Sequence, residues 1–479
     1  MQMNKGMNMK YRLIGVLLAL LCGMTACVAR PVEESGTEWQ GKELFEPAGE
    51  MEGSVLDLNA RYETYSENMA LAFVQNQPTD GGAFETETYE DGVKITAYTG
   101  SENVVVVPET ISGKQVLALG ESSFADSSVR AVKVPDCVRV IEKGAFASCD
   151  NLVTLAVPFV GDGGENTHFG YIFGADSYEN HPLSVPVSLD MVLLGNGVER
   201  IEENAFAGCK SLSAVCLPDS VTEIADFAFY ECKDLVYITP TNAVHSVGNY
   251  AFGYCTSLFM AYFDEVQHFG LGAFYGCSSL RILSLPFVGG TATENRFIGY
   301  LFGAESADYN AAFVPKSLYS VIVSDADEIP DRAFAGCAYV AKFLLEDGAK
   351  SIGVRAFYGC RSIVEISLPD SVKQIGNDAF FGCDNMQKID LGDSLESIGS
   401  QAFLGCRALS SVTIPDGVSE LLPSTFAYCK ALVKVELSAV KKIGKDAFYG
   451  CESLEPPAIA GAEVADGNEA LFGGEGVEE

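Results

Sequence analysis

Cysteine is the residue with most capacity for chemistry in this sequence, and eleven of the 15 cysteines recur in one pattern. Each closes an Ala-Phe-x-x-Cys element, with Thr replacing Ala before Phe426, and successive cysteines are 22, 23 or 60 residues apart. If the intervening segments stack, neighbouring thiols come about 5 Å apart, within reach of a disulfide. The eleven are Cys149, Cys209, Cys232, Cys255, Cys277, Cys337, Cys360, Cys383, Cys406, Cys429 and Cys451.

These thiols are nevertheless expected to stay free. Without Cys22 and Cys27 near the N-terminus, 13 cysteines remain, an odd number, and a uniform column gives no reason for one pairing over another. A zinc site needs ligands that converge from close spacings, which intervals of 23 residues along a column do not provide. We therefore predict a buried ladder of free thiols that act as small apolar spacers.

Histidine and acidic residues offer little else for catalysis. Of four histidines, His168 and His181 share one irregular segment but have no counterpart in its later copy, whereas His245 and His268 are expected at the surface. The acidic stretch 162–166 lacks the ligand spacing of a calcium loop. Because nucleophile-elbow, P-loop and zinc-protease motifs are also missing, we predict no enzyme, no catalytic or metal-binding residues and no cofactor.

Composition narrows the possible partners. The 479 residues contain 31 Lys and Arg against 65 Asp and Glu, a net charge of −34, but only 20% are charged and 48% are apolar. Such a chain is expected to fold. Its negative charge opposes attraction to a phosphate backbone, so nucleic acid is excluded as a partner.

The elements that must position the thiols are short strands in a repeat of about 23 residues. In residues 362–380, Ile363, Ile366 and Leu368 recur at every third or second position, and no single coil can bury such a face without neighbours. Pro after the strand removes a hydrogen-bond donor where pairing stops, and Gly before the Ala-Phe pair is expected to permit a tight bend. These positions are Pro158, Pro218, Pro286, Pro369 and Pro415, and Gly248, Gly353, Gly376, Gly399 and Gly444.

The repeat unit resembles the BspA-like leucine-rich repeat family of bacterial surface proteins, whose unit reads roughly Leu-x-x-Ile-x-Leu-Pro-x-Ser-Val-x-x-Ile-Gly-x-x-Ala-Phe-x-x-Cys. The resemblance implies an α/β, β-rich leucine-rich repeat solenoid. We count about 14 coils of 22–23 residues, including two long ones. Members are implied to be extracellular adhesion or binding proteins, each with its own ligand.

The two long coils, residues 152–188 and 280–317, match each other at an interval of 128 residues. Phe173 and Phe302 are expected to replace the phenylalanine of the Ala-Phe pair in the core. Extra residues in a solenoid coil commonly emerge as a loop, and such loops often bind ligands. Four tyrosines are expected to be exposed there: Tyr171, Tyr178, Tyr300 and Tyr309.

The N-terminus has the organisation of an export signal. Basic residues precede the apolar run 13–21, which is too short to span a bilayer, and small residues lie just before Cys27. The sequence Met24-Thr25-Ala26-Cys27 resembles the lipobox of bacterial lipoproteins, which implies acylation of Cys27; plain secretion is the alternative. We predict a signal peptide at 1–26, a lipidated Cys27 with a flexible linker at 27–84, the solenoid at 85–455 and an acidic tail at 456–479. Within the linker, residues 57–73 have some helical spacing, so a short helix is the alternative there.

A ligand site is expected on the outward strand face. Two residues beyond the inward Leu of each strand, the outward column contains Thr154, Ala214, Tyr237, Met260, Ile282, Lys342, Glu365, Lys388, Ser411 and Lys434. Tyr237, Met260, Tyr262 and Ile282 form an apolar patch there, which serves a ligand or is covered from within the chain.

These observations predict a surface-exposed protein, exported and lipid-anchored to the bacterial cell envelope, that binds extracellular protein without catalysis. One alternative is glycan binding, with Tyr171, Tyr300 and the strand aromatics as stacking platforms; another is a spacer without a ligand.

Overall fold

The computed structural model describes residues 77–238, 243–458 and 461–472, and over this range the chain is a β-solenoid of about 16 turns with little helix. The predicted leucine-rich repeat solenoid is confirmed, with slightly more turns than the 14 counted from sequence. The predicted signal peptide and Cys27 lie outside the described residues. Internal contacts divide the chain into two units: unit 1 includes 77–198 and 211–220, and unit 2 includes 199–210, 221–237, 243–458 and 461–472.

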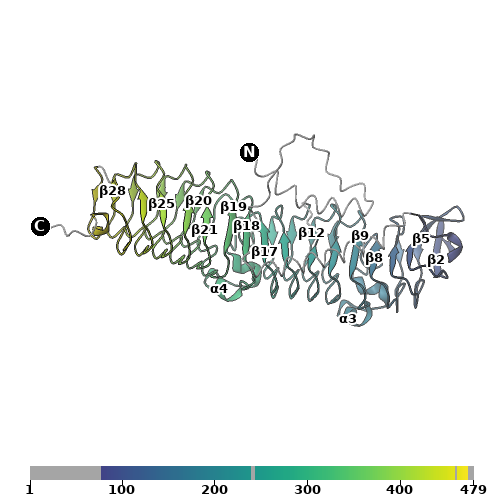
Figure 1. The fold of residues 1–479 in the computed structure, drawn as a ribbon. Coiled ribbons are helices and arrows are strands. Elements are labelled where there is room, and N and C mark those ends of the chain that lie inside the picture. Colours follow the sequence, from purple (N-terminus) through teal and green to yellow (C-terminus); the bar gives the residue numbers. More distant parts are fainter. Residues whose placement is uncertain (1–76, 239–242, 459–460, 473–479) are drawn as a thin grey trace. The chain divides into compact units, whose positions relative to one another are not determined.

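Unit 1 begins with an antiparallel hairpin and continues as a parallel sheet (Figure 1). The hairpin, β1 (Phe84–Tyr89) and β2 (Gly92–Tyr98), joins β5 (Lys114–Leu119), which also pairs with β4 (Thr110–Ile111) and β7 (Val140–Ile141). The main sheet has the order β13-β11-β9-β8-β6-β3, in which the end strand β13 is Tyr237–Ile238. Its strands are β3 (Val104–Val106), β6 (Ala131–Lys133), β8 (Thr154–Val157), β9 (Met191–Leu194) and β11 (Ala214–Cys216).

Unit 2 repeats the same main strand, one per coil, in parallel register. After β13 (Tyr237–Ile238), one sheet contains β15 (Met260–Tyr262), β17 (Ile282–Leu285), β18 (Ser320–Val323) and β19 (Lys342–Leu345). The next contains β21 (Glu365–Ser367), β23 (Lys388–Asp390), β25 (Ser411–Thr413) and β27 (Lys434–Glu436). Central residues such as Ile389 are buried and their neighbours exposed, as alternation in a one-sided sheet requires.

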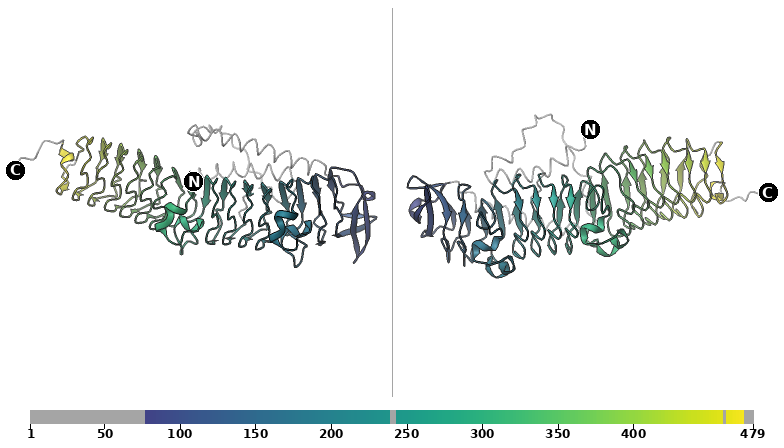
Figure 2. Two further views of the ribbon diagram at one scale, coloured as in Figure 1. Left: turned by 90° about the horizontal axis from the view of Figure 1, so that it is seen from below. Right: turned by 180° about the vertical axis from the view of Figure 1, so that it is seen from behind.

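Most regular coils of unit 2 have a second, two-residue strand, and these also pair in parallel (Figure 2); in the coil of β18 a single bridge from Ile329 to Ile352 takes its place. Together with the main strands they close the coil around its core. They are β10 (Arg200–Ile201), β12 (Glu223–Ile224), β14 (Ser246–Val247), β16 (His268–Phe269), β20 (Ser351–Ile352), β22 (Gln374–Ile375), β24 (Ser397–Ile398), β26 (Glu420–Leu421), β28 (Lys442–Ile443) and β29 (Glu463–Val464).

The two long coils contain the short helices that stand out at the edge of the coils in Figure 1. In unit 1 these are η2 (Phe169–Phe173), η3 (Tyr178–Asn180) and α3 (His181–Ser184); in unit 2 they are η4 (Ile298–Phe302), η5 (Ala307–Tyr309) and α4 (Asn310–Phe313). Phe173 packs on Phe146 and Phe302 on Phe274, at centroid distances of 6.2 and 6.4 Å. Both rings are buried, so their predicted place in the core is confirmed.

The core is a stack of the Ala-Phe phenylalanines. In unit 2, Phe357, Phe380 and Phe403 lie parallel, 5.0 and 5.3 Å apart, and all three are fully buried. The backbone maintains this spacing, because the Phe N–H donates to the carbonyl of the residue before the core phenylalanine of the next coil, at 2.7 Å from Phe357 to Ala379 and 2.9 Å from Phe403 to Thr425. One aromatic ring per coil therefore fills the solenoid interior at van der Waals contact.

The glycine before each Ala-Phe pair has a different role from the one predicted. Its φ is not positive; instead, a Cβ on Gly399 would lie 2.5 Å from Asn377 N, in the backbone of the preceding coil. The left-handed residues are those two positions before Phe, such as Gln401 with φ 58°, and the one before Cys, such as Gly405 with φ 76°. The prediction of a tight bend at the first glycine was wrong: close stacking of backbones excludes a side chain there.

Regular structure is also present just beyond both predicted solenoid limits. η1 (Gly81–Ala83) precedes β1, and the N–H of Thr79 donates to Val106 O at 2.9 Å. At the other end, β29 pairs with β28, and η6 (Glu469–Phe472) follows. The buried Asn468 accepts the Phe448 N–H at 3.1 Å and donates to Gly444 O at 3.0 Å, so its amide satisfies backbone groups of the last coils.

Candidate functional site

The outward strand face of unit 2 brings the predicted patch together. Met260 pairs with Ile282, and Tyr262 with Ser284, in the parallel register of β15 and β17. The Phe259 N–H donates to Val236 O at 3.4 Å, which places Tyr237 on the strand beside Met260. All four patch residues, Tyr237, Met260, Tyr262 and Ile282, are half-buried.

One further outward apolar residue that sequence analysis did not place, Leu344 of β19, is exposed, whereas Ser284 and Ile322 between it and the patch are buried. The second outward column runs from Tyr262 through Ser284 and Ile322 to Leu344. Leu344 is 38% exposed, a large value for an apolar side chain on a strand. The alternation of side chains along β19 could have predicted that Leu344 faces outward, because it lies two residues after the outward Lys342.

Carboxylates lie beside this patch. Asp264 accepts hydrogen bonds from Ser284 Oγ at 2.5 Å and Ser324 Oγ at 3.5 Å. Partial burial raises the pKa of Glu346, and the nearby charges of Asp264 and Asp347 add to the effect. The apolar surface therefore has an acidic margin, which favours a ligand with basic groups at its periphery.

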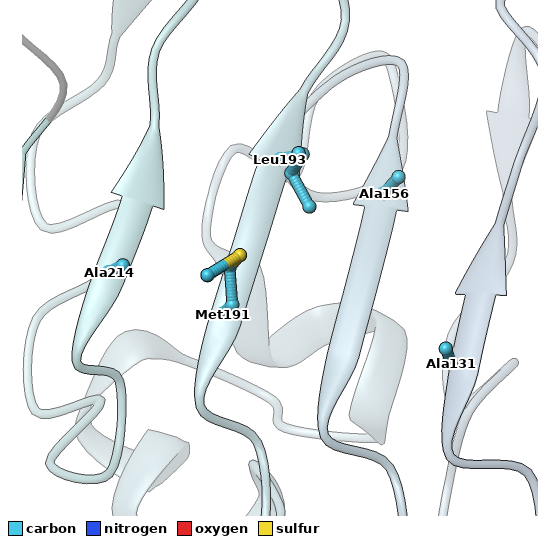
Figure 3. Packing of buried hydrophobic residues seen from close by; sticks show 5 residues of the cluster. All are labelled: Ala131, Ala156, Met191, Leu193 and Ala214. Atoms are coloured by element: carbon cyan, nitrogen blue, oxygen red, sulfur yellow. The ribbon is translucent and has the colours of Figure 1, made fainter. Parts of the chain in front are cut away.

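The predicted outward column is exposed only over part of its length. Lys342, Glu365, Lys388, Ser411 and Lys434 are exposed, as expected. In unit 1, however, Thr154 and Ala214 are only 1% and 4% exposed, although they hold the same outward strand position. The outward residues Ala131, Ala156, Met191 and Leu193 of the same sheet are buried as well (Figure 3).

The long-coil tyrosines divide into two kinds. Tyr178 and Tyr309 are exposed, as predicted, but Tyr171 and Tyr300 are half-buried. Their carbonyls accept backbone N–H groups of the preceding coil, from Gly144 at 3.0 Å and Gly272 at 2.9 Å, so both residues form part of the turn. Their rings contact His168 and Phe297 respectively, edge to face.

A second aromatic surface was missed by sequence analysis. It lies on the Ala-Phe turns of unit 2 and interleaves rings from successive coils at centroid distances of 5.2–5.7 Å. Tyr254 is 37% exposed and the others are half-buried. The sequence feature that could have predicted this surface is the presence of aromatic residues on both sides of the core phenylalanine. We call this set the turn cluster: Phe227, Tyr230, Tyr250, Tyr254 and Tyr275.

The cysteine column is a ladder of thiols that form hydrogen bonds to the backbone. All 13 cysteines of the described residues are free, and the ladder thiols are buried. Most of them donate to the carbonyl of the core phenylalanine one coil earlier, at 3.1 Å from Cys232 to Phe206 and 3.3 Å from Cys383 to Phe357. Burial raises the pKa of Cys232 and Cys383 far above the ordinary value, which suppresses thiolate chemistry.

The histidine pair is internal to the first long coil. His168 Nδ1 and His181 Nε2 are 3.0 Å apart, and His181 is fully buried. The place of His181 at the start of α3 is taken in α4 by Asn310, which accepts the Gly299 N–H at 2.8 Å. His245 and His268 are exposed, as predicted.

In the acidic stretch 162–166, the carboxylate of Asp162 accepts hydrogen bonds from residues of the same stretch. Asp162 accepts from Gly164 N at 2.7 Å and from Asn166 Nδ2 at 2.6 Å. Among the described residues, no cluster of three or more His, Cys, Asp or Glu side chains could hold a metal ion. No helix in that part of the chain is both long and apolar enough to cross a membrane.

Stacked coils with one parallel strand each, a phenylalanine core and a broad strand face define a leucine-rich repeat protein. The chain belongs to the family with the BspA type leucine rich repeat region, whose model matches residues 104–161, 186–297 and 327–455 in six copies.

Several solved structures are similar to this chain. A leucine-rich repeat protein from Bacteroides ovatus is 22% identical, with 76% of this chain and 100% of that one covered and a TM-score of 0.37. A leucine rich cell surface protein from Faecalibacterium prausnitzii is 23% identical, with coverage of 82% and 96% and a TM-score of 0.28. A T. pallidum leucine rich repeat protein is 20% identical, with coverage of 79% and 91% and a TM-score of 0.20. No curated protein matches.

Proposed function

We propose that this chain is an exported, lipid-anchored surface protein that binds an extracellular protein, without catalysis, through the strand face of unit 2. The observation that carries the proposal is the patch of Tyr237, Met260, Tyr262 and Ile282 on neighbouring parallel strands. The outward residues of β21 to β27 are polar and exposed at the same strand position. A half-buried apolar surface with an acidic margin suits a protein partner with an apolar centre and a basic rim.

Rigidity supports the same proposal. The strands that carry the patch are fixed by parallel pairing on one side and a phenylalanine stack on the other, so a ligand orders few additional side chains on binding. Leucine-rich repeat proteins generally bind proteins.

The test is saturable binding to immobilised host matrix proteins, with a glycan array in parallel. The double variant Tyr237→Ala and Met260→Ala should weaken a protein interaction by at least about tenfold, because aromatic and methionine anchors at the centre of an interface contribute most. The matched control is Lys388→Ala with Ser411→Ala. It changes the same outward strand position in coils where that position is polar, and it should leave the affinity unchanged. An equal loss of affinity in the two double variants would refute a ligand site on the strand face.

Glycan binding is the second candidate, and the turn cluster favours it. Its rings are interleaved and Tyr254 is 37% exposed, an arrangement on which sugar rings can stack. Tyr254→Ala should then abolish glycan binding while Tyr237→Ala leaves it intact; Tyr171 and Tyr300 are weaker platforms because they are half-buried. If neither a matrix protein nor a glycan binds, a spacer without a ligand becomes the favoured function.

The anchor at Cys27 has its own test. Cys27→Ser removes the thiol that the lipobox resemblance assigns to acylation, so the chain should move from the membrane fraction to the soluble fraction. Cys137→Ser is the control, since Cys137 lies in the solenoid. Retention of Cys27→Ser in the membrane fraction would contradict lipid attachment at that residue.

A further inference from the structure

The turn cluster contains aromatic residues in a backbone conformation that disfavours them. Phe227, Tyr250 and Tyr254 have φ of 55°, 50° and 58°, in the left-handed region where a bulky side chain is crowded. In seven of the eleven repeats that end in a ladder cysteine, the position of Tyr254, directly before the cysteine, is glycine. An aromatic residue there costs backbone free energy. Three such residues in two neighbouring coils indicate that these rings have a use other than folding.

The tyrosine rings of the turn cluster lie against glycines of the next coil. A Cβ on Gly276 would be 2.7 Å from Tyr254 Cδ1, and one on Gly272 would be 2.7 Å from Tyr250 Cε1. A side chain at either glycine would displace the ring, so the rings pack on bare backbone. Because neighbouring coils interlock in this way, the cluster is held in place before a ligand arrives, which reduces the ordering cost of binding.

Tyr254 lies at the centre of this surface. Its ring meets the rings of Tyr230 and Tyr275 at nearly right angles, with centroid distances of 5.6 and 5.2 Å, and the residue is nevertheless 37% exposed. Because the cluster consists mainly of tyrosines, it combines aromatic rings with hydroxyl groups that donate and accept hydrogen bonds. A matching ligand has apolar C–H faces and hydroxyl groups along its length, which is the chemistry of a chain of sugar rings.

Charge beside the turn cluster selects among sugars. The coil of Tyr230 has three carboxylates in its turn, Asp226, Glu231 and Asp234, against one lysine, Lys233, which lies 3.8 Å from Glu231. Burial raises the pKa of Tyr230, and the charge of Glu231 adds to the effect, so this carboxylate is close to the rings. Together with the net charge of −34, these carboxylates oppose polysaccharides that carry sulfate or carboxylate groups.

We propose that the turn cluster binds an uncharged polysaccharide, which runs across the successive turns of Phe227, Tyr254 and Tyr275 and stacks on Tyr254. This inference rests on the glycan-binding candidate of the proposed function and deepens it, since it assigns the class of sugar, the central ring and the direction of the ligand. The site is separate from the strand face, because the main strands and the Ala-Phe turns occupy different parts of each coil.

The test is a titration of the full chain with two groups of polysaccharides. Mannan, laminarin and dextran are uncharged, whereas heparin and hyaluronan are anionic. Saturable binding is expected for at least one uncharged polymer and for neither anionic polymer. Tyr254→Gly removes the central ring and relieves the left-handed backbone, and it should weaken the binding of the uncharged polymer by at least about tenfold.

Tyr428→Gly is the matched control. Tyr428 also precedes a ladder cysteine, has φ of 61° and is 46% exposed, but it lies outside the turn cluster. The same substitution should therefore leave the affinity for the polysaccharide unchanged.

A further variant, Tyr254→Ala, separates binding from folding. Glycine adopts a positive φ without strain, whereas alanine does not. Tyr254→Gly should therefore unfold at a thermal midpoint no lower than that of Tyr254→Ala, while both variants lose the polysaccharide. A lower midpoint for Tyr254→Gly would remove the argument from backbone strain.

Three results would each overturn the proposal: preferred binding of heparin or hyaluronan, no binding of any uncharged polymer, or equal affinities of Tyr254→Gly and Tyr428→Gly for the polymer that binds. The strand-face variant, Tyr237→Ala with Met260→Ala, shows which proposal has failed. If this variant loses the polysaccharide and Tyr254→Gly does not, glycan binding stands but its site is not the turn cluster. If a matrix protein binds through the strand face and no polymer binds, only the turn-cluster proposal fails.

Discussion

His168 and His181 face each other across 3.0 Å within the first long coil, Nδ1 to Nε2, with their rings stacked at a centroid distance of 5.2 Å. Burial lowers the pKa of His168; Asp162 raises it and Lys143 lowers it further. In the second long coil the corresponding places are held by Phe297 and Asn310, which do not titrate. The two copies of one coil thus differ in their response to acid.

Acidification should destabilise the first long coil. Because the folded-state pKa of His168 is depressed, the unfolded chain takes up its proton first, and stability falls as pH drops below about 6.5. The thermal midpoint should therefore decrease between pH 7 and pH 5. The double variant His168→Phe and His181→Asn, which copies the second coil, should lose this part of the decrease, whereas His245→Asn, at the surface, should retain it. Identical pH profiles for all three chains would contradict the assignment.

Asn310 should be important for the stability of the second long coil. Its side chain accepts the Gly299 N–H at 2.8 Å and donates to Arg332 O at 3.1 Å, while fully buried. Asn310→Ala leaves these backbone groups unsatisfied and should lower the free energy of unfolding by about 2–3 kcal/mol. Thr293→Ala, exposed in the same coil, should change it by less than about 0.5 kcal/mol. Chemical denaturation measures both; similar small effects would show that the amide contributes little.

Replacement of one ladder thiol should weaken two adjacent coils. Cys383→Ala removes the hydrogen bond to Phe357 O and leaves a small cavity, at a cost of about 1–2 kcal/mol. Cys137→Ala, at a half-buried thiol outside the ladder, should cost less. The denaturation midpoint of the full chain is measured for both variants. Equal midpoints would show that the ladder thiols contribute no more to stability than Cys137 does.

Close stacking of coils predicts an asymmetry between glycines. Gly399→Ala places a methyl group 2.5 Å from Asn377 N, so the coils must separate, which should cost about 1–3 kcal/mol. Gly197→Ala is the matched control, because the nearest heavy atom, Pro158 O, is 4.0 Å away and the site is exposed. Comparable thermal midpoints for the two variants would show that the backbones adjust freely.

Much of the fold followed from spacing alone. The recurrence of Ala-Phe-x-x-Cys predicted stacked coils, free thiols and the replacement of the core phenylalanine by Phe173 and Phe302, because one residue per coil at fixed spacing must form a column. Alternation around Met260 and Ile282 also placed the patch on adjacent strands correctly. The hydrogen bonds of the thiols escaped prediction, since sequence does not show which carbonyl lies opposite each sulfur.

The repeat period, the inward residues and the family are therefore properties of the sequence by itself, since local alternation and fixed spacing determine which side chains a coil must bury. Tertiary structure decided which outward residues are exposed: Leu193 and Leu344 hold corresponding strand positions, yet one is buried and the other exposed. It also decided that His181 pairs with His168 while Asn310 binds backbone. The partners of His181 and Asn310 lie 11 to 22 residues away, and only the folded coil brings them together.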